Sequence, residues 1–508
     1  MTGVSAGDVA LIKASGMFDE TWYLDQYPDV RKLGMDPVEH YLWIGPLLRR
    51  NPSPKFDSTA YLQVNDDVAA TGVNPLLHYA RWGRTEGRPV TLVVDVAMPT
   101  APSIRKGAVA PVIAYESHNL KHQGAPNSLF EIASGMKQRG NFHPILFANS
   151  TGPLVEQYQA RNIDAVMHGV SPNRLKDSAT REKYIQALGD FYLRHRVSLV
   201  HVNTLQNFHS VLAADRVGIP AIWNIRESED PETYYDYLAP DLREQAYSCF
   251  GKASAVVFVA EATRKLWQPR LTGLVDNLSI LNGIDTDRIM KFVYGANRPS
   301  LRAALGVGES DVLLLNVGTV SERKGQQDLV AGLKLLDNET RRRIVLAVVG
   351  FNSTHYSKST MADLDALRKE GVRMHLLDES PGEEDRRKVA ELYLAADAFV
   401  LTSRVESYPR VTLEAMEFGL PIISTPCFGV CEQLVANESV LFYAEGDAQQ
   451  LSSHIRLLCH DKHERQKMGQ AANARLKHLN SYEQMLAAYE SVYRRVLGTS
   501  RRSLKGVA

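Results

Sequence analysis

The stretch from Ala395 to Glu432 constrains the fold of this chain more than any other part of its sequence. It reads as an apolar run (AFVLTS), a polar turn, an amphipathic segment (VTLEAMEFG) closed by Gly419, and a second apolar run (LPIIST). Apolar runs of this length predict buried strands, and the apolar spacing between them predicts a helix. The stretch therefore predicts a strand–loop–helix–strand unit of an α/β sheet.

Two glutamates flank the expected start of this helix. Glu406 lies in the loop after the first strand, and Glu414, eight residues further on, lies about one turn into the helix. Pro409 suits the first helical position, and the free N–H groups behind it favour a phosphate, because they lie at the positive end of the helix dipole. The pattern indicates a site for a phosphorylated, hydroxyl-rich ligand. The alternative is a solvated helix surface that carries two glutamates.

The whole run resembles the E-x7-E signature of retaining GT-B glycosyltransferases of the family 4 type (glycosyl transferases group 1). The residues that carry the match are Glu406, Glu414, Ala415, Met416, Gly419, Pro421, Gly429 and Glu432. The resemblance covers the chain roughly from Pro111 to Leu497. It implies an α/β protein with two Rossmann-like doubly wound domains across a cleft. It also implies transfer of a hexosyl group from a nucleotide-diphosphate sugar to a hydroxyl acceptor, with retention at the anomeric carbon.

The resemblance gives the two glutamates different roles. Glu414 is expected to accept hydrogen bonds from the ribose hydroxyls of the donor, and Glu406 is expected to be catalytic at the transferred sugar. The neighbouring residues are expected to complete the substrate-binding stretch: Ser407, Tyr408, Arg410, Val411 and Thr412. No protein carboxylate is clearly placed as a nucleophile, which favours a same-face displacement assisted by the leaving phosphate.

A second expected substrate contact is Lys324, followed by Gly325, which resembles the KG pair of the family. The family lysine neutralises the donor diphosphate, so Lys324 is expected to bind the substrate and to assist catalysis. The family often carries a basic residue at the position of Thr319, and Arg323 is expected to supply that charge instead. Two cations at a helix start oppose the helix dipole, which favours an anionic ligand over a solvated pair.

The first α/β region contributes Gly124 and Asn127 to the expected substrate site. Both lie in a loop, HNLKHQGAPN, between a strand (VIAYES) and a helix expected from Ser128. A single glycine, without G-x-G-x-x-G spacing, argues against a dinucleotide cofactor. The loop instead resembles the GGAxxSL turn that opens the donor cleft of the family, with Gln123 in place of the first glycine.

Arg226 marks a departure from the family pattern. Many members carry a histidine near the reacting centre after the strand that here reads AIWNIRES, and Arg226 is the nearest matching residue. Two interpretations stay open: a catalytic contact at the sugar, or a salt-bridged cleft wall.

The N-terminal region contains an internal repeat, in which the segment from Phe18 is echoed from Phe56. The matched pairs are Phe18/Phe56, Tyr23/Tyr61, Val30/Val68, Gly34/Gly72, Pro37/Pro75, His40/His78 and Gly45/Gly83. Each copy predicts two short helices around a Gly-x-x-Pro turn, and the two are expected to pack on each other or on the main body. His40 and His78 are expected to be structural hydrogen bonders. The repeat resembles FDxxxYLxxYPDV modules of some bacterial polysaccharide glycosyltransferases, and its expected ligand is a protein or the acceptor.

Composition excludes several functions. The 508 residues have zero formal net charge, which gives no argument for nucleic acid, and the four cysteines are expected to be free thiols. No DxD-type carboxylate pair suggests a metal, so no metal and no cofactor besides the nucleotide-sugar donor are expected. No apolar run approaches the roughly 18 residues that span a bilayer. The expected location is the cytoplasm, with peripheral contact at the inner face of the membrane as a further option.

The expected domain organisation has five parts: a helical repeat module (1–90), a linker (91–110), an acceptor-side domain (111–297), a nucleotide-sugar-binding domain (298–478), and a C-terminal helix with its tail (479–508). The acceptor is expected to be a glycan, a lipid-linked or another hydroxyl compound, in bacterial surface polysaccharide or glycoconjugate synthesis. The competing interpretation is a non-catalytic protein that binds a nucleotide sugar or glycan on the same fold. The presence of both Glu406 and Glu414 favours the enzyme.

Overall fold

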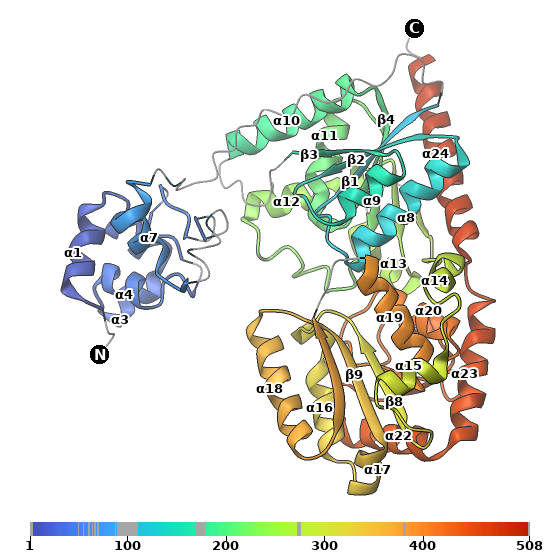
Figure 1. Ribbon diagram of the computed structural model, residues 1–508. Helices are drawn as coiled ribbons and strands as arrows, with labels where there is room; N and C mark the ends of the chain where they lie inside the picture. The colour runs from blue at the N-terminus through green and yellow to red at the C-terminus, as the bar shows by residue number, and fades with distance from the viewer. Residues whose placement is uncertain are drawn as a thin grey trace. The chain divides into compact units, whose positions relative to one another are not determined.

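The computed structural model of the chain (Figure 1) describes residues 4–48, 50–53, 55–58, 61–62, 65, 68, 71–86, 88, 110–168, 178–271, 276–378 and 383–505. The chain divides into two units, Met1–Val96 and Ala97–Ala508, which are described separately. The linker expected at 91–110 lies outside the described residues except for its last position.

The first unit is built from short helices. They are α1 (Ala6–Ala14), α2 (Glu20–Gln26), α3 (Pro28–Leu33), α4 (Pro37–Trp43), α7 (Pro75–His78) and the π-helical turn η1 (Tyr79–Gly83). Helix α3 ends at Gly34, whose φ of 64° lies in the left-handed region that glycine tolerates best. Asp36 caps α4 through its side chain, and Pro37 begins that helix. The expected Gly-x-x-Pro turn is therefore present.

The two repeats pack on each other around one core. Buried residues from both copies form it: Ile12, Tyr23, Val30, Val38, Tyr41, Phe56, Tyr61, Val68, Leu76 and Tyr79. The histidines make equivalent hydrogen bonds, because Nδ1 of His40 lies 3.1 Å from the Tyr23 hydroxyl and Nδ1 of His78 lies 2.9 Å from the Tyr61 hydroxyl. The prediction that these histidines are structural is confirmed.

The second unit begins with a seven-stranded parallel sheet in the order β3-β2-β1-β4-β5-β6-β7. Its strands are β1 (Val112–Ser117), β2 (His143–Ala148), β3 (Asp164–Met167), β4 (Val197–Asn203), β5 (Ala221–Ile225), β6 (Ala255–Phe258) and β7 (Asp276–Ser279). The helices of this domain are α8 (Gly124–Arg139), α9 (Leu154–Ala160), α10 (Ser178–Arg194), α11 (Phe208–Arg216), α12 (Pro240–Ser248), α13 (Glu261–Trp267) and α14 (Thr286–Phe292). Short 3₁₀ turns lie at η3 (Leu205–Asn207), η4 (Cys249–Gly251) and η5 (Gln268–Arg270).

A six-stranded parallel sheet in the order β10-β9-β8-β11-β12-β13 forms the next domain. Its strands are β8 (Val312–Val317), β9 (Ile344–Phe351), β10 (Arg373–Asp378), β11 (Ala398–Leu401), β12 (Ile422–Ser424) and β13 (Val440–Phe442). Its helices are α15 (Arg298–Ala304), η6 (Glu322–Lys324), α16 (Gln326–Lys334), α17 (Asn338–Arg343), α18 (His355–Lys369), α19 (Glu383–Ala395), α20 (Arg410–Glu417), α21 (Val430–Gln433), α22 (Ala448–His460) and α23 (Lys462–Leu476). The expected fold class, two doubly wound Rossmann-like domains, is confirmed.

Three short strands lie at sheet edges. Strands β3 and β7 end the first sheet and β13 ends the second. Each has only three or four residues, and β7 (DNLS) is largely polar and no residue of it is fully buried. An edge strand pairs on one side only, so it does not need the apolar run that marks a central strand.

The sheet order places the loops that matter for function. In each sheet the strand order reverses at one central pair, so that earlier strands lie on one side of it and later strands on the other. The pair is β1 and β4 in the first sheet and β8 and β11 in the second. Loops that follow such strands diverge and leave a crevice at the carboxyl ends, where ligands of doubly wound folds bind. Glu406 follows β11, and Arg226 follows β5.

Helix α24 (Tyr482–Lys505) connects the end of the chain to the first sheet. It lies against α8 in Figure 1 and buries Leu486, Tyr489 and Tyr493 in the core of the first domain. The approach of the preceding loop is close, because a Cβ on Gly283 would lie 2.5 Å from backbone atoms of Ser481. The C-terminal segment therefore packs on the domain to which it does not belong in sequence.

The division into two units predicts that the second folds without the first. A chain shortened to start at Arg105 should keep the α/β content and the thermal unfolding midpoint of that part of the full-length protein, because its cores contain no residue before Val112. Circular dichroism and calorimetry of both chains provide the test. Aggregation of the shortened chain, or loss of its cooperative transition, would contradict the division.

Candidate functional site

A cleft of about 670 Å³ lies between the two α/β domains, at the carboxyl ends of both sheets. Its walls come from the loops after β1, β4, β5, β8 and β11 and from α8, α14, α19 and α20. Eleven of the residues expected in the site line this cleft: Gly124, Asn127, Arg226, Arg323, Lys324, Glu406, Ser407, Tyr408, Arg410, Val411 and Glu414. The fold thus brings together residues that lie up to 290 positions apart in the sequence.

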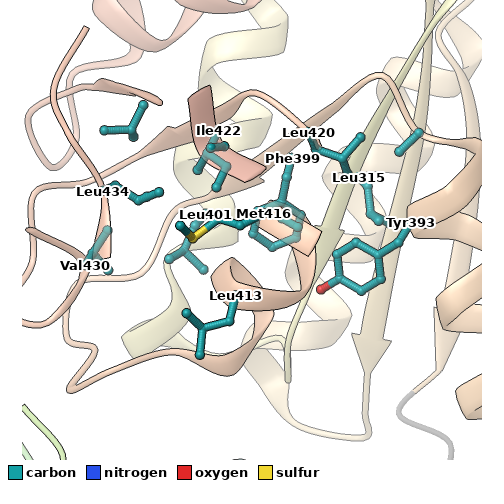
Figure 2. Packing of buried hydrophobic residues seen from close by; sticks show 14 of the residues in the cluster. Leu315, Tyr393, Phe399, Leu401, Leu413, Met416, Leu420, Ile422, Val430 and Leu434 are labelled. Carbon is teal, nitrogen blue, oxygen red and sulfur yellow. The ribbon is translucent and has the colours of Figure 1, made fainter. Parts of the chain in front are cut away.

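Apolar packing holds helix α20 against strands β11 and β12. Leu413 and Met416 project from α20 toward Phe399, Leu401 and Ile422 on β11 and β12 (Figure 2). Because these side chains bury one side of the helix, Glu414 lies on the opposite side, which lines the cleft. Pro409 is the N-cap, with φ of −66° and ψ of 134°, so the helix starts at Arg410 and the expectation of Pro409 at the first helical position is wrong by one residue.

Glu406 and Lys324 form an ion pair at one end of this cleft. Lys324 Nζ contacts Glu406 Oε1, the Ser403 hydroxyl donates to the same oxygen at 2.8 Å, and Arg323 Nη1 lies 3.9 Å from Oε2. Burial raises the pKa of Glu406, but the two cations and the hydroxyl lower it further, so the pKa falls below its ordinary value. The structure therefore favours the ionised form of Glu406. Its partner Lys324 is a cation that another anion could also bind.

Glu414 lies in a different electrostatic environment. Burial raises its pKa, and the nearby Glu131 carboxylate raises it as well, while Arg410, Arg386 and a hydrogen bond with Tyr393 lower it. The net direction is upward. The pKa values of Glu406 and Glu414 are thus shifted in opposite directions.

Arg410 spans the boundary between the domains. Its Nη2 lies 2.7 Å from Oε1 of Glu131 on α8, and both side chains are largely buried. Arg410 Nη1 and Glu131 Oε2 are buried without a hydrogen-bond partner among the described residues. One nitrogen and one oxygen of this pair therefore remain for a ligand.

Ser407 and Tyr408 also contact the first domain. The Ser407 hydroxyl donates to the Arg226 carbonyl at 2.7 Å and accepts from the Ser228 hydroxyl at 2.8 Å. Asn282 Nδ2 donates to the Tyr408 carbonyl at 3.1 Å. These residues were expected to bind substrate, and in the structure they also connect the two domains.

Thr412 is the exception among the expected site residues. Its side chain is fully buried and its hydroxyl lies 2.7 Å from the Pro409 carbonyl and contacts Oε1 of Gln433. It does not belong to the cleft lining, so its hydroxyl does not reach a ligand there. The hydroxyl instead fixes the start of α20.

Gly124 and Asn127 lie in the first turn of α8, which begins at Gly124 and not at Ser128. Proline is tolerated in a first helical turn, so Pro126 does not delay the helix as the sequence suggested. Asn127 Oδ1 accepts a hydrogen bond from Nη2 of Arg386 at 2.6 Å. The N-terminal end of a sixteen-residue helix therefore opens onto the cleft.

Arg226 is surrounded by asparagines. Its Nε donates to Oδ1 of Asn203 at 2.7 Å, and its Nη1 donates to Oδ1 of Asn282 at 3.1 Å. Burial lowers the pKa of Arg226. The next residue, Glu227, lines the cleft too, and burial raises its pKa to about 7. The salt-bridged interpretation of Arg226 is wrong among the described residues, because no carboxylate lies within ion-pair distance of it.

Four cleft residues were missed by sequence interpretation: Glu131, Glu227, Asn282 and Arg386. Glu131 and Arg386 occupy helices in which a charged residue is ordinary, so no local pattern marks them. Asn282 stands in an Asn-Gly dipeptide, which is a common turn signal and does not by itself mark a site. Glu432 lies outside the cleft lining and contacts the first domain, because its carboxylate accepts hydrogen bonds from the backbone N–H groups of Glu261 at 3.0 Å and Ala262 at 2.6 Å.

Two general findings concern metals and membranes. Within the described residues, no three His, Cys, Asp or Glu side chains come together in a way that could hold a metal ion. None of the described helices combines the length and apolar character needed to cross a membrane.

Comparison with known sequences gives a partial family match. Residues 297–475 match the profile of the family described as Glycosyl transferases group 1. N-acetyl-alpha-D-glucosaminyl L-malate synthase from Bacillus anthracis is 24% identical over 222 residues, which are 44% of this chain and 54% of that protein. D-inositol 3-phosphate glycosyltransferase from Xylanimonas cellulosilytica is 32% identical over 170 residues, which are 30% of this chain and 39% of that protein. The chain spans about half the length of the curated relatives that it matches.

Comparison with solved structures shows the fold. Anabaena Alr3699/HepE in complex with UDP and glucose has a TM-score of 0.63 and 17% identity, covering 76% of this chain and 100% of that one. Sucrose-phosphate synthase from Thermosynechococcus elongatus has a TM-score of 0.62 and 16% identity, covering 77% and 100%. The two α/β domains therefore have the GT-B fold of glycosyltransferase structures.

The opposite pKa directions of Glu406 and Glu414 predict opposite responses of stability to pH. Glu406 has a lowered pKa when folded, so its contribution is present above its ordinary value of 4.5 and is lost as the pH falls through the lowered pKa. Glu414 has a raised pKa when folded, so its contribution is present below 4.5 and is lost as the pH rises through the raised pKa.

Thermal unfolding of Glu406→Gln and Glu414→Gln beside the unaltered protein, from acid to neutral pH, measures both effects. The stability advantage of the unaltered protein over Glu406→Gln should grow with pH, and its advantage over Glu414→Gln should shrink. Parallel curves for the two variants would show that the two environments are alike.

Gly429 offers a test of the loop that carries Glu406. A Cβ at this position would lie 1.6 Å from the Ser407 carbonyl oxygen, so the loop must move to admit alanine. We expect Gly429→Ala to lower the free energy of unfolding by about 1–3 kcal/mol. Gly498→Ala on α24 is the matched control, since a Cβ there meets nothing within 4 Å, and alanine should stabilise that helix by about 0.5–1 kcal/mol. Denaturant titration decides between them, and equal effects would contradict the close approach.

Proposed function

We propose that this chain is a retaining glycosyltransferase of the family 4 type, which transfers a hexosyl group from a nucleotide-diphosphate sugar to a hydroxyl acceptor. The observation that carries the proposal is the ion pair of Lys324 and Glu406 beside the start of α20, with Glu414 one turn into that helix, all in one cleft. The family match over residues 297–475 and the names of the curated relatives support it. The neighbour with bound UDP and glucose supports a nucleotide-sugar donor.

The leaving diphosphate needs positive charge, and this site supplies it. Lys324, Arg323 and the N–H groups at the start of α20 lie around one end of the cleft. A lysine ammonium and a helix N-terminus stabilise a phosphate anion more strongly where water is excluded. In this proposal the chain's own cations carry that function and no metal or cofactor takes part.

The transfer step exchanges one bond at the anomeric carbon for another. The bond from that carbon to the diphosphate oxygen breaks, and its electron pair leaves with the diphosphate. The acceptor hydroxyl oxygen forms the new bond on the same side of the sugar ring, and its proton goes to the leaving phosphate. Glu406 lies where its negative charge stabilises the positive charge that develops on the sugar ring. Arg226, across the cleft from Glu406, is proposed to contact a sugar substrate.

In this proposal the remaining cleft residues bind the donor. Glu414 accepts hydrogen bonds from the ribose hydroxyls, and Val411, with Tyr408, lines the space beside it. Gly124 and Asn127 present the start of α8 to the diphosphate or the sugar. Ser407 and Arg410 contact the substrate where they also contact the first domain.

The acceptor is a glycan, a lipid-linked or another hydroxyl compound, reached at the inner face of the cytoplasmic membrane. The process served is bacterial surface polysaccharide or glycoconjugate synthesis, and the N-terminal repeats bind the acceptor or a protein.

A panel of nucleotide sugars tests the function directly. Thermal stabilisation identifies the donor, because a ligand at 100 times its Kd adds about 2.7 kcal/mol. NMR of the product then reports the anomeric configuration. Transfer with retention is the expected result. Donor binding without turnover on any acceptor would favour a non-catalytic binding protein instead.

Lys324→Met should weaken nucleoside diphosphate binding at least tenfold, because a charge-assisted hydrogen bond contributes about 1.5–3 kcal/mol and 1.4 kcal/mol is tenfold in affinity. Calorimetry measures it. Lys334→Met is the control, since Lys334 lies half-exposed on α16 and pairs with Asp363. The double variant Lys324→Met/Glu406→Gln removes both charges of the pair. If binding returns in the double variant, an unpaired Glu406 caused the loss and Lys324 does not contact the phosphate.

The two glutamates should separate kinetically. Glu414→Gln should raise KM for the donor with a smaller effect on kcat, because a ribose contact is present in ground and transition states alike. Glu406→Gln should lower kcat with donor affinity nearly kept, since its charge matters most in the transition state. Steady-state kinetics at saturating acceptor measure both. The reverse pattern would exchange the roles, and changes within about twofold, roughly 0.4 kcal/mol, would remove this stretch from the active site.

A further inference from the structure

Arg226 is a partly exposed cation whose side-chain hydrogen-bond partners are all neutral. Besides Asn203 and Asn282, it contacts Asn224: in the amide orientation that satisfies both ends of Asn224, Oδ1 accepts from Arg226 Nη2 at 3.3 Å and from the Tyr489 hydroxyl at 2.7 Å. Each of the three guanidinium nitrogens thus has one asparagine acceptor. A guanidinium has five N–H groups, so two N–H bonds remain.

The nearest carboxyl in sequence, Glu227, forms no ion pair with this guanidinium. Both oxygens of Glu227 lie 3.2 Å from the backbone nitrogen of Leu205, and Oε2 also accepts from the Arg226 backbone nitrogen at 2.9 Å. Because burial raises the pKa of Glu227 to about 7, that carboxyl carries only part of a charge at neutral pH. No ion pair to Arg226 exists within the described part of the chain.

Two other cations of the same cleft are paired. Lys324 has Glu406, and Arg410 has Glu131 at 2.7 Å. A buried charge without a counter-charge costs several kcal/mol, and asparagine oxygens supply hydrogen bonds but no negative charge. Among the described residues Arg226 has no ion-pair partner, and only the more distant carboxylates of Glu227 and Glu131 act on its charge. Its planar fork matches a carboxylate or a phosphate.

We propose that Arg226 binds an anionic group, a carboxylate or a phosphate, on one of the two sugar substrates. The inference rests on the proposed function and narrows its substrate class. The Arg226 carbonyl accepts from the hydroxyl of Ser407, the residue after Glu406, which places this anion site at the reacting end of the cleft. Glu414 and the expected ribose position lie on α20, beyond that end.

The anionic group has two possible sources, and each has its own experiment. If it belongs to the donor, UDP-glucuronate should bind more tightly than UDP-glucose in calorimetry. If it belongs to the acceptor, glucuronate or glucose 6-phosphate should bind better than glucose in saturation-transfer NMR with saturating UDP present. At least one of these preferences, of about tenfold or more, is expected.

Three variants assign the preference to the guanidinium. Arg226→Gln should abolish the preference, while Arg226→Lys should keep part of it. Arg288→Gln is the control, since Arg288 lines the same cleft and contacts Gln157 and the Phe130 ring. Thermal unfolding of each variant checks that the fold is retained.

Two results would overturn the inference. The first is UDP binding without any preference for an anionic sugar in either experiment, which leaves the proposed function intact. The second is a preference that survives in Arg226→Gln or disappears in Arg288→Gln. Absence of binding to every nucleoside diphosphate and nucleotide sugar of the panel would instead remove the proposed function, and this inference with it.

Discussion

Charge compensation inside the cleft is the constraint on which the arrangement of the second unit depends. Several charged side chains of two domains are largely buried at this cleft, and an unpaired buried charge costs several kcal/mol. That cost is a large part of the roughly 5–15 kcal/mol by which a domain is stable. The pair of Arg410 and Glu131 satisfies the constraint only when both domains are in contact, because α20 supplies one partner and α8 the other. The interface is thus fixed by electrostatics as well as by apolar packing.

This constraint links ligand binding to the contact between the domains. The segment after β11 supplies Ser407 and Tyr408 to the interface and Glu406 to the cleft, within three consecutive residues. An anion that binds Lys324 competes with Glu406 for the same ammonium group. The residues of the cleft and of the domain contact are therefore neighbours in one short segment.

Much of the fold could be predicted from the sequence because its central strands are buried on both sides. Strand β1 coincides with the apolar run VIAYES, and the unit β11–α20–β12 was recognised from alternating apolar runs and the closing Gly419, whose φ is 65°. The edge strands β3, β7 and β13 give weak signals because each has only three or four residues. The repeat in the first unit was predictable for a different reason. Its aromatic residues recur because each copy contributes half of one shared core.

The residues of the candidate site differ in whether a local sequence motif predicts them. Glu406, Glu414 and Lys324 could be predicted because each stands in a local motif beside a helix or turn of defined geometry. Glu131 and Arg386 could not, since their function depends on partners contributed by the other domain: Glu131 meets Arg410 across 279 positions of sequence, and Arg386 meets Asn127 across 259. Arg226 lies between these cases. Its residue type was visible as a departure from a family pattern, but the sequence left open a contact at the sugar and a salt-bridged cleft wall, and the three asparagines around it depend on tertiary structure. A local motif shows which residue type a backbone position needs. The partner of a charged side chain, by contrast, can lie hundreds of positions away in the sequence, and only the folded structure brings the two together.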